Sequence, residues 1–446
     1  MPPRKYRAGR PGRRLPPPGK VYLIPVELFF EIFRLTIQAD SCSRVNLMLV
    51  CRRWRHIMLS TPGINVQLRI QRSTEKKDVE AVTQGRSLLD VVVDMNNEKY
   101  GKRFNPRKFY ACFVVIAQVA SRWHSFELLS SPPHGEHKDL RIVQPLEHLT
   151  VLKLALGCSL GNFLKPFMFT IATTATPQLN TMEVADPDAL LYLVQPVWLR
   201  ISHSLTTLKI QLARKMVNHV DILPHLHQLE TFHANHLCLP IYPPDTHLPL
   251  IQTLHILYLR CVSVQWMNGR LFPALQKCSI ISPHDADTIL SVNLPSCSLL
   301  KYESDSLAPL GHFNVLSLSR LEVRCGQWSS WRGNLQLVIL HPTFSTAQSM
   351  TCLHLQVLCS ETLLAHMLRL VPTLEELWLG LANPHMLSKA FFLAFVSGGT
   401  GVGAPSAPSN QTTRALCGGL KRLHLHYKRW LRALRKQQSS QPLVVL

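Results

Sequence analysis

Two hexapeptides near the C-terminal end share one spacing: Leu374-Glu-Glu-Leu377-Trp-Leu379 and Leu420-Lys-Arg-Leu423-His-Leu425. Because residues i and i+2 of a strand point to the same side, each L-x-L core predicts a short strand with one buried apolar face. The gaps between such units are mostly about 20 to 32 residues, which is the repeat range of a solenoid. Clear copies occur at 149–154, 205–210, 254–259 and 318–323, and weaker ones near Val91, Phe126, Met182, Leu229, Leu275, Leu300 and Leu353.

This repeat predicts an α/β fold in which parallel strands stack into an irregular solenoid, because no single unit can bury its apolar face alone. We expect helical returns between strands at Ala189–Leu193 and Glu361–Leu370. The Gly- and Ser-rich stretch 397–413 predicts a flexible insertion, and 421–436 predicts a last strand followed by a basic capping helix.

A different pattern precedes the repeats, at residues 23–61. Leu28, Phe29, Ile32 and Phe33 recur at helical spacing behind Pro25, a residue that the first turn of a helix tolerates. After a polar interval, a second helix is expected, with Leu47, Val50, Cys51, Trp54, Ile57 and Met58 on one face.

The stretches that carry this pattern are Ile24-Pro25-Val26-Glu27-Leu28, Glu31-Ile32-Phe33 and 49–55, Leu-Val-Cys-Arg-Arg-Trp-Arg. In order and spacing they resemble the F-box. The sequence departs from the family at Ile24, where leucine is usual, and at Ile64-Asn65, where a Leu-Trp pair is usual. The resemblance implies docking onto a Skp-type adaptor and, through it, onto a cullin. It implies an adaptor contact at or beside Ile24, Pro25, Leu28, Ile32, Val50, Cys51 and Trp54.

A second resemblance extends the first. The stretch 86–94, Arg-Ser-Leu-Leu-Asp-Val-Val-Val-Asp, and the later Ser121-Arg-Trp-His-Ser-Phe-Glu-Leu128 resemble the segment after the F-box in large families of mushroom-forming fungi. There a strand is followed by a helix and a further strand. The L-x-x-L-x-L core likewise resembles the leucine-rich repeat. The expected organisation is a basic disordered arm at 1–20, an F-box at 21–70, a leucine-rich-repeat-like solenoid at 71–436 and a tail at 437–446.

Composition limits the classes of function. Hydrophobic residues make up 46% of the 446 residues, which predicts a folded chain, and no apolar run approaches the length of a membrane span. The 12 cysteines form no Cys-x-x-Cys pair and predict reduced core thiols, hence a cytoplasmic or nuclear protein. The net charge of +21 is concentrated at the ends, with seven basic residues in 1–20 and nine after Glu376. This excess favours an acidic or phosphorylated segment as the target.

Three other kinds of site were weighed. The stretch 157–161, Gly-Cys-Ser-Leu-Gly, matches the nucleophile elbow of a serine esterase, with Ser159 as nucleophile and Asp186 and His385 as candidate partners. No Gly-rich oxyanion segment precedes it, so a solenoid turn is the preferred interpretation. Close histidine pairs lack further clustered ligands, so no metal and no cofactor is expected. Tyr427 and Trp430 lie among basic residues, so nucleic-acid binding is an alternative for this segment. The preferred interpretation is a basic cap that covers the end of the solenoid.

The target-binding surface follows from strand geometry. In each L-x-L strand the middle residue points away from the core, which in the leucine-rich-repeat family is the exposed concave face. Tyr258 and Trp378 are the expected anchors, because aromatic residues dominate binding hot spots. The chain is therefore predicted to be a non-catalytic subunit of a ubiquitin ligase that holds a target protein, with an F-box scaffold outside a working ligase as the alternative. The candidate target contacts are Glu127, Lys153, Lys209, Tyr258, Glu322, His354, Trp378 and His424.

Overall fold

The computed structural model describes residues 24–39, 47, 49–60, 65–95, 105–129, 142, 144–154, 176, 178–185, 201–212, 228–237, 239, 250–283, 291–304, 308–324, 349–356, 361–380, 387–388, 391 and 419–426. Its main element is a sheet of 14 parallel strands, each paired with its neighbours in chain order. The strands are β1 (Val66–Ile70), β2 (Leu89–Val93), β3 (Trp123–Leu128), β4 (Val151–Leu154), β5 (Thr181–Val184), β6 (Thr207–Gln211), β7 (Thr231–Asn235), β8 (Ile256–Arg260), β10 (Lys277–Ile281), β12 (Leu299–Glu303), β14 (Arg320–Arg324), β15 (Cys352–Gln356), β16 (Glu376–Gly380) and β17 (Arg422–His426).

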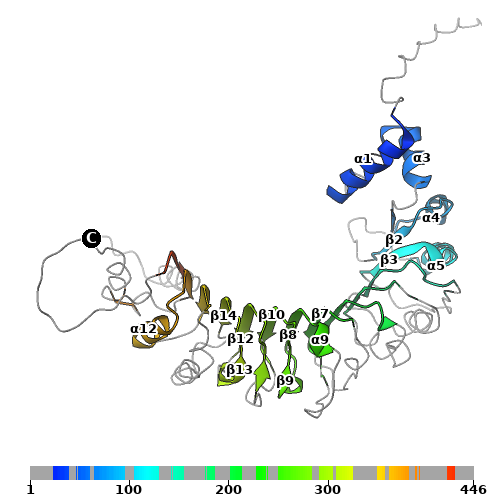
Figure 1. Ribbon diagram of the computed structural model, residues 1–446. Helices are drawn as coiled ribbons and strands as arrows, with labels where there is room; N and C mark the ends of the chain where they lie inside the picture. Colours follow the sequence, from blue (N-terminus) through cyan, green and yellow to red (C-terminus); the bar gives the residue numbers. More distant parts are fainter. Residues whose placement is uncertain are drawn as a thin grey trace, which may run out of the picture.

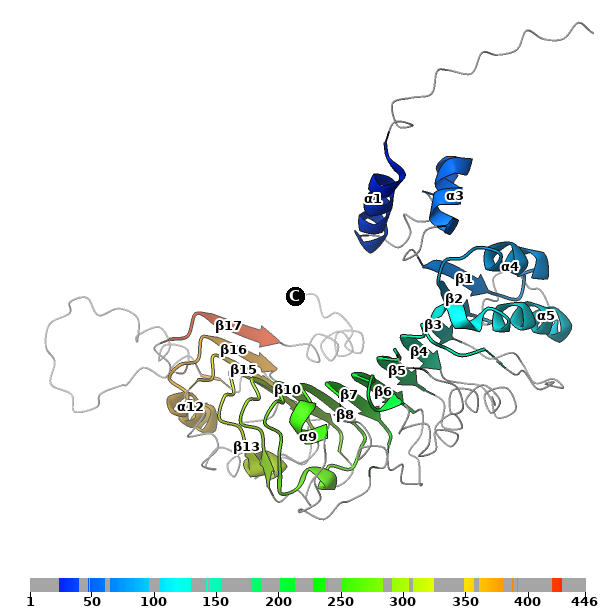
Figure 2. The same cartoon turned by 45° about the vertical axis from the view of Figure 1, so that its right-hand side comes forward.

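The strands follow an arc with the sheet on its inner side (Figure 1). Turning the view shows the strands as successive rungs from β1 to β17 (Figure 2). The outer side carries α5 (Pro106–Ala117), α9 (Leu250–Thr253) and α12 (Glu361–Leu370). α4 (Lys76–Thr83) lies beside α5 at the N-terminal end of the arc. The structure is therefore a mixed α/β solenoid of the leucine-rich-repeat type.

Alternate burial explains why these segments form strands. The motif leucines of β4, β6, β8 and β16 are at most 2% exposed, and the residues between them are half-buried. All six clear motifs predicted from the sequence coincide with strands, as do the seven weaker ones. In β17, Leu423 and Leu425 are only half-buried, because this strand ends the sheet.

Polar side chains bind consecutive repeats together just before the strands begin. The hydroxyl of Thr206 donates to the carbonyl of Asn180, and that of Thr351 donates to the carbonyl of Ser319, each in the preceding repeat. A hydroxyl residue also stands directly before the first leucine of three motifs. These hydroxyls donate to a backbone carbonyl of the preceding repeat, and the residues are Ser204, Thr253 and Thr373. The carbonyls of Asn180 and Ser319 also accept backbone N–H groups of the next repeat, so there the hydroxyls add to the backbone hydrogen bonds between repeats.

A second, short parallel sheet lies on the outer side. It consists of β9 (Arg270–Leu271), β11 (Val292–Asn293) and β13 (Phe313–Asn314) in the order β13-β11-β9. The amide of Asn314 donates to the side-chain carbonyl of Asn293 at 3.1 Å across two of these strands. The 3₁₀ turns η3 (Ala120–Arg122), η5 (Gln265–Met267) and η7 (Ala308–His312) complete the returns that the structure describes.

Two helices precede the sheet: α1 (Val26–Ala39) and α3 (Arg52–Ser60). They have a small core of their own, made by Phe29, Phe33 and Ile57, with Trp54 packed against it. The ring of Trp54 lies 5.6 Å from that of Phe29 and 5.0 Å from that of Phe33. This core is separate from the core of the solenoid.

Several sequence predictions can now be placed. The helical return at Glu361–Leu370 is confirmed as α12, and the strand–helix–strand order after residue 86 is confirmed by β2, α5 and β3. Strand β1 lies inside the range 21–70 expected for the F-box but is the first strand of the sheet; it was missed because the first leucine motif in the sequence lies near Val91. The expected second helix is interrupted at Cys51: Leu47, Leu49 and Val50 are helical, Cys51 is not, and α3 begins at Arg52. The arm 1–20, the return at Ala189–Leu193, the insertion 397–413, the capping helix and the tail 437–446 lie outside the described residues.

Candidate functional site

One row of side chains crosses the inner face of the sheet, because the strands pair in register. All eight candidate target contacts lie on this row, and each is half-buried. Their alignment is thus as strand geometry predicts, while their role in binding stays a prediction. The row reads, from β1 to β17, Arg69, Val92, Glu127, Lys153, Glu183, Lys209, His233, Tyr258, Ser279, Lys301, Glu322, His354, Trp378 and His424.

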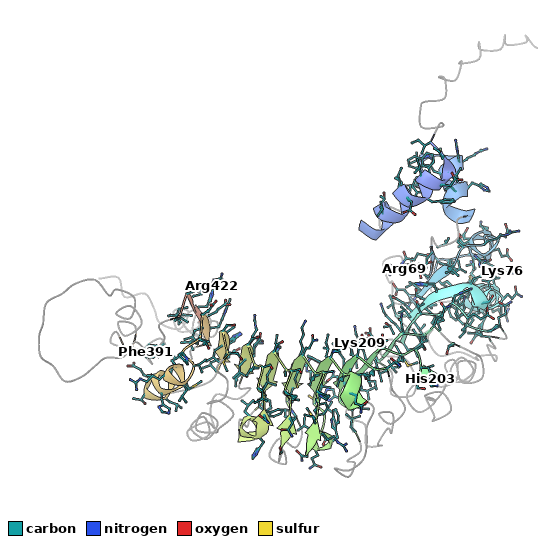
Figure 3. The ribbon with its side chains drawn as sticks, in the orientation of Figure 1. Arg69, Lys76, His203, Lys209, Phe391 and Arg422 are labelled. Carbon is teal, nitrogen blue, oxygen red and sulfur yellow. The ribbon has the colours of Figure 1, made fainter. Side chains whose placement is uncertain are left out.

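Six members of the row were not singled out from the sequence. Most lie in strands whose core positions hold Met, Phe, Ala, Cys or Tyr instead of leucine, as in Met182-Glu183-Val184 and Cys278-Ser279-Ile280. The alternation of apolar and polar residues is still present there and would have found them. Figure 3 labels Arg69, Lys209 and Arg422 on strands of this face, and His203 and Phe391 elsewhere.

A polar network occupies the N-terminal end of the face. Asp90 accepts a hydrogen bond from the hydroxyl of Ser125 at 2.8 Å, and its Oδ1 lies 3.0 Å from Nδ1 of His124 and 3.4 Å from Nδ2 of Asn65. Nε2 of His124 lies 3.2 Å from the hydroxyl of Thr150. This order of carboxylate, imidazole and hydroxyl has the form of a catalytic triad. However, the Thr150 hydroxyl is in position to donate to the backbone carbonyl of His124 at 3.0 Å, so the network ties repeats together.

Charges at both ends of the row are neutralised within the chain. Nζ of Lys153 lies 2.6 Å from Oε1 of Glu127, and Arg69 pairs with Asp94 on the adjacent strand. Toward the other end, Nη2 of Arg320 lies 2.8 Å from Oε1 of Glu322. These acids are therefore already engaged and offer little to a basic ligand.

An aromatic cluster lies at the C-terminal end of the row. The rings of Trp378 and His424 stack at 3.8 Å with an angle of 11°, and His354 lies 5.8 Å away on the adjacent strand. The indole N–H of Trp378 donates to Glu376 at 2.8 Å, which holds the pKa of that carboxyl below its ordinary value. Nε2 of His424 is 3.3 Å from the same carboxylate but is buried without a hydrogen bond in the described part of the chain. Trp378 therefore has its N–H and one face engaged within the chain.

The centre of the row is different, because its polar groups have few partners. The rings of His233 and Tyr258 stack at 5.3 Å. Burial, with the positive charge of Lys209 beside it, lowers the pKa of His233 below its ordinary value, so this imidazole is neutral at pH 7. Oγ of Ser279 is buried with no hydrogen-bond partner among the residues that the structure describes.

Four of the described thiols are core groups. Burial raises the pKa of Cys297 to about 11 and that of Cys278 well above its ordinary value. Cys112 and Cys352 are also buried, as the sequence predicted. A thiol with a raised pKa is a poor nucleophile at pH 7, so these four cysteines fit no catalytic role.

The two helices carry a second candidate surface. Leu28 is 55% exposed, Ile32 48% and Val50 58%, and Pro25 is exposed as well. Ile24, Cys51 and Trp54 are half-buried. The sulfur of Cys51 accepts a hydrogen bond from the backbone N–H of Trp54 at 3.4 Å, so this residue caps α3.

Two further apolar residues of this surface were missed. Leu35 is 58% exposed and Leu49 68% exposed. Leu35 follows Leu28 and Ile32 at the spacing of one helix face, a signal that the sequence contains. The large exposed apolar side chains of the described residues are Val26, Leu28, Ile32, Leu35, Leu49, Val50, Val114, Leu129, Leu271 and Leu316.

The remaining candidate sites from the sequence are the esterase elbow, the nucleic-acid segment and the metal site. Ser159, Asp186 and His385 lie outside the described residues, as do Tyr427 and Trp430. In the ranges given above, no three His, Cys, Asp or Glu side chains come together in a way that would hold a metal ion. Among the helices of those ranges, none has the length and apolar character needed to cross a membrane.

The sheet, its register and its repeated core place the chain in the class of leucine-rich-repeat-like solenoids. No protein-family model matches the chain, and no curated protein matches its sequence. Among solved structures, it is similar to an internalin from Listeria monocytogenes, with 12% sequence identity and a TM-score of 0.33. That similarity covers 83% of this chain and 85% of the internalin. The class of fold rests on the strand order and burial of the chain itself.

Proposed function

We propose that this chain is a substrate-recognition subunit of a Skp-cullin-F-box ubiquitin ligase. In this proposal α1 and α3 dock a Skp-type adaptor, the adaptor joins the chain to a cullin, and the inner face of the solenoid holds a target protein. The chain contributes proximity and orientation, and another subunit transfers ubiquitin.

The apolar surface of the helical pair is the observation that carries the docking half of the proposal. Of the ten large exposed apolar side chains in the described residues, six belong to residues 26–50. Among the side chains of this pair that the structure describes, three are fully buried. A unit with so small a core and so much apolar surface gains stability by covering that surface with a partner. The resemblance of this segment to the F-box is the reason for proposing a Skp-type adaptor as that partner.

The inner face supports the target-binding half. It is a sheet surface with aromatic and charged side chains, and none of the described helices lies on it in either view of the ribbon (Figures 1 and 2). Concave solenoid faces of this kind are extended binding surfaces for other macromolecules.

Adaptor capture tests the docking half. A tagged full chain is recovered from host lysate, and the Skp-type adaptor and the cullin are measured by mass spectrometry. We expect Leu28→Asp and Ile32→Asp each to lower adaptor recovery by more than about tenfold, because each would bury a carboxylate in an apolar contact. Val114→Asp is the matched control, since Val114 is 48% exposed on α5, away from the helical pair. Equal recovery by wild type and both α1 variants would overturn the proposal.

Trp54→Ala is the less informative variant. Trp54 packs against Phe29 and Phe33 inside the helical pair, so its loss removes core packing together with any adaptor contact. The exposed leucine and isoleucine test the surface without disturbing the core.

A further inference from the structure

The centre of the inner face differs in charge from its two ends. We define the central patch as the inner-face positions of β6, β7, β8, β10 and β12. Its fifteen positions include four basic residues, Lys209, Arg260, Lys277 and Lys301, and one acid, Glu303. On the row itself, the five positions Lys209, His233, Tyr258, Ser279 and Lys301 include no acid.

The cations of the patch are unpaired within the described part of the chain. Lys209, Lys277 and Lys301 make no ion pair there, in contrast to Lys153, Arg69 and Arg320, whose acids lie within 2.9 Å. Oγ of Ser279 and Oδ1 of Asn235 are buried on the same strands without hydrogen-bond partners among the described residues. Ser279 and Asn235 thus keep unused hydrogen-bonding capacity beside the unpaired lysines, as Arg324 and His424 do farther along the sheet.

The patch is also partly apolar. The stacked rings of His233 and Tyr258 lie on the row between Lys209 and Lys301. The apolar residues Ile256 and Leu299 are inner-face positions next to the row. His233 adds no competing charge at pH 7, because its pKa is lowered. A ligand that fits must therefore combine negative charge with apolar side chains.

We infer that the central patch binds an extended acidic segment of the target protein, with one carboxylate at Lys209 and another at Lys301. This inference rests on the proposed role of the inner face in target binding. It assigns the class of target segment and the lysines that select it.

Strand spacing fixes the expected separation of the two carboxylates. Lys209 and Lys301 lie four strand steps apart, from β6 to β12, which is about 19 Å at about 4.8 Å per step. An extended peptide rises about 3.3 Å per residue, so the same distance takes about six residues. Because side chains alternate along an extended chain, acids six positions apart point to the same side.

A peptide titration tests the inference on the purified full chain. The probe is a fluorescent ten-residue peptide of Ala, Leu and Gly with glutamate at its second and eighth positions. Its affinity is compared with that of peptides bearing glutamate at the second and fifth positions, or glutamine at the second and eighth. We expect the first peptide to bind at least about tenfold more tightly than either of the others, with binding that weakens as salt is raised.

Charge reversal then tests the two lysines. Lys209→Glu and Lys301→Glu are each expected to weaken binding of the first peptide by about tenfold or more, because like charges meet in the complex. Lys76→Glu is the matched control: it reverses the charge of an exposed lysine on α4, which is not part of the inner face, and affinity should not change.

Three results would overturn the inference: no peptide binds, affinity is independent of glutamate spacing, or an oligothymidylate of ten nucleotides binds as tightly as the acidic peptide and loses the same affinity in the lysine variants. The last result would indicate a polyanion or nucleic-acid surface. Adaptor capture on the same preparations separates this failure from that of the proposed function. A chain that captures the adaptor but ignores the peptides keeps its proposed docking half and loses the assigned target class.

Discussion

At the scale of single residues, His233 makes stability depend on pH in a predictable direction. Its pKa is lowered by burial first, then by the charge of Lys209. The unfolded chain therefore binds a proton at a higher pH than the folded chain does, so the contribution of His233 to stability is complete above about pH 6.5 and is lost as pH falls through the folded pKa. We expect the His233 ring signals in NMR to titrate with a midpoint below 6.5, and His233→Gln to flatten the fall in urea midpoint between pH 7 and pH 5. An ordinary or higher midpoint would contradict the role of burial.

Residue orientation was predictable, and residue pairing was not. Alternation within a strand predicts that Lys153, Trp378 and His424 face away from the core, and the row confirms it. The stack of Trp378 on His424 depends on which strands are neighbours and in what register. Aligning the leucine motifs of neighbouring repeats predicts this strand register only approximately. Trp378 was expected to be an aromatic anchor; its stack on His424 follows from strand pairing, whereas its hydrogen bond to Glu376 lies within β16.

At the scale of elements, the cost of a cavity should follow the position of a strand in the sheet. Leu377 in β16 is 0% exposed between two neighbouring strands, while Leu423 in β17 is half-buried at the end of the sheet. We expect Leu377→Ala to lower the free energy of unfolding by about 2–5 kcal/mol, and Leu423→Ala by less than about 2 kcal/mol. Urea titration with hydrogen exchange on β15 to β17 measures both. Equal costs would mean that β17 is covered as fully as the inner strands.

Strands were easier to predict than the segments between them. A strand here needs only alternate apolar residues, so thirteen of the fourteen strands of the main sheet coincide with a motif in the sequence. The exception, β1, reads Val-Gln-Leu-Arg-Ile and alternates clearly, but lacks the leucine spacing. The returns differ in kind: α12 shows helical periodicity, whereas β9, β11 and β13 are two residues long each and are too short to carry a period.

At the scale of the whole molecule, the chain has two cores of unequal size. The solenoid core runs without a break from Val66 to Phe391, with each repeat packed on its neighbours. The helical core has Phe29, Phe33 and Ile57 as its fully buried members. The sequence predicted this division, because helical spacing changes to leucine-repeat spacing between the two parts. The curvature of the arc comes from small rotations between repeats, which the sequence does not encode in any readable way.

Separate cores should lose their protection separately. Phe33 is 0% exposed, and a buried Phe→Ala change costs about 3–5 kcal/mol, which is more than a pair of helices with so small a core can lose and stay folded. We therefore expect Phe33→Ala to raise deuterium uptake across 24–39 and 52–60, and to leave the uptake of β1 to β4 unchanged. Leu152→Ala, in β4, is the reciprocal variant: it should expose β3 to β5 and spare the helices. If Phe33→Ala loosens the strands as well, the helices are part of the solenoid core. In that case a destabilised solenoid would release its target and its adaptor together. The urea midpoint of the whole chain would then have to be measured for each α1 variant before a loss of adaptor capture is assigned to the docking surface.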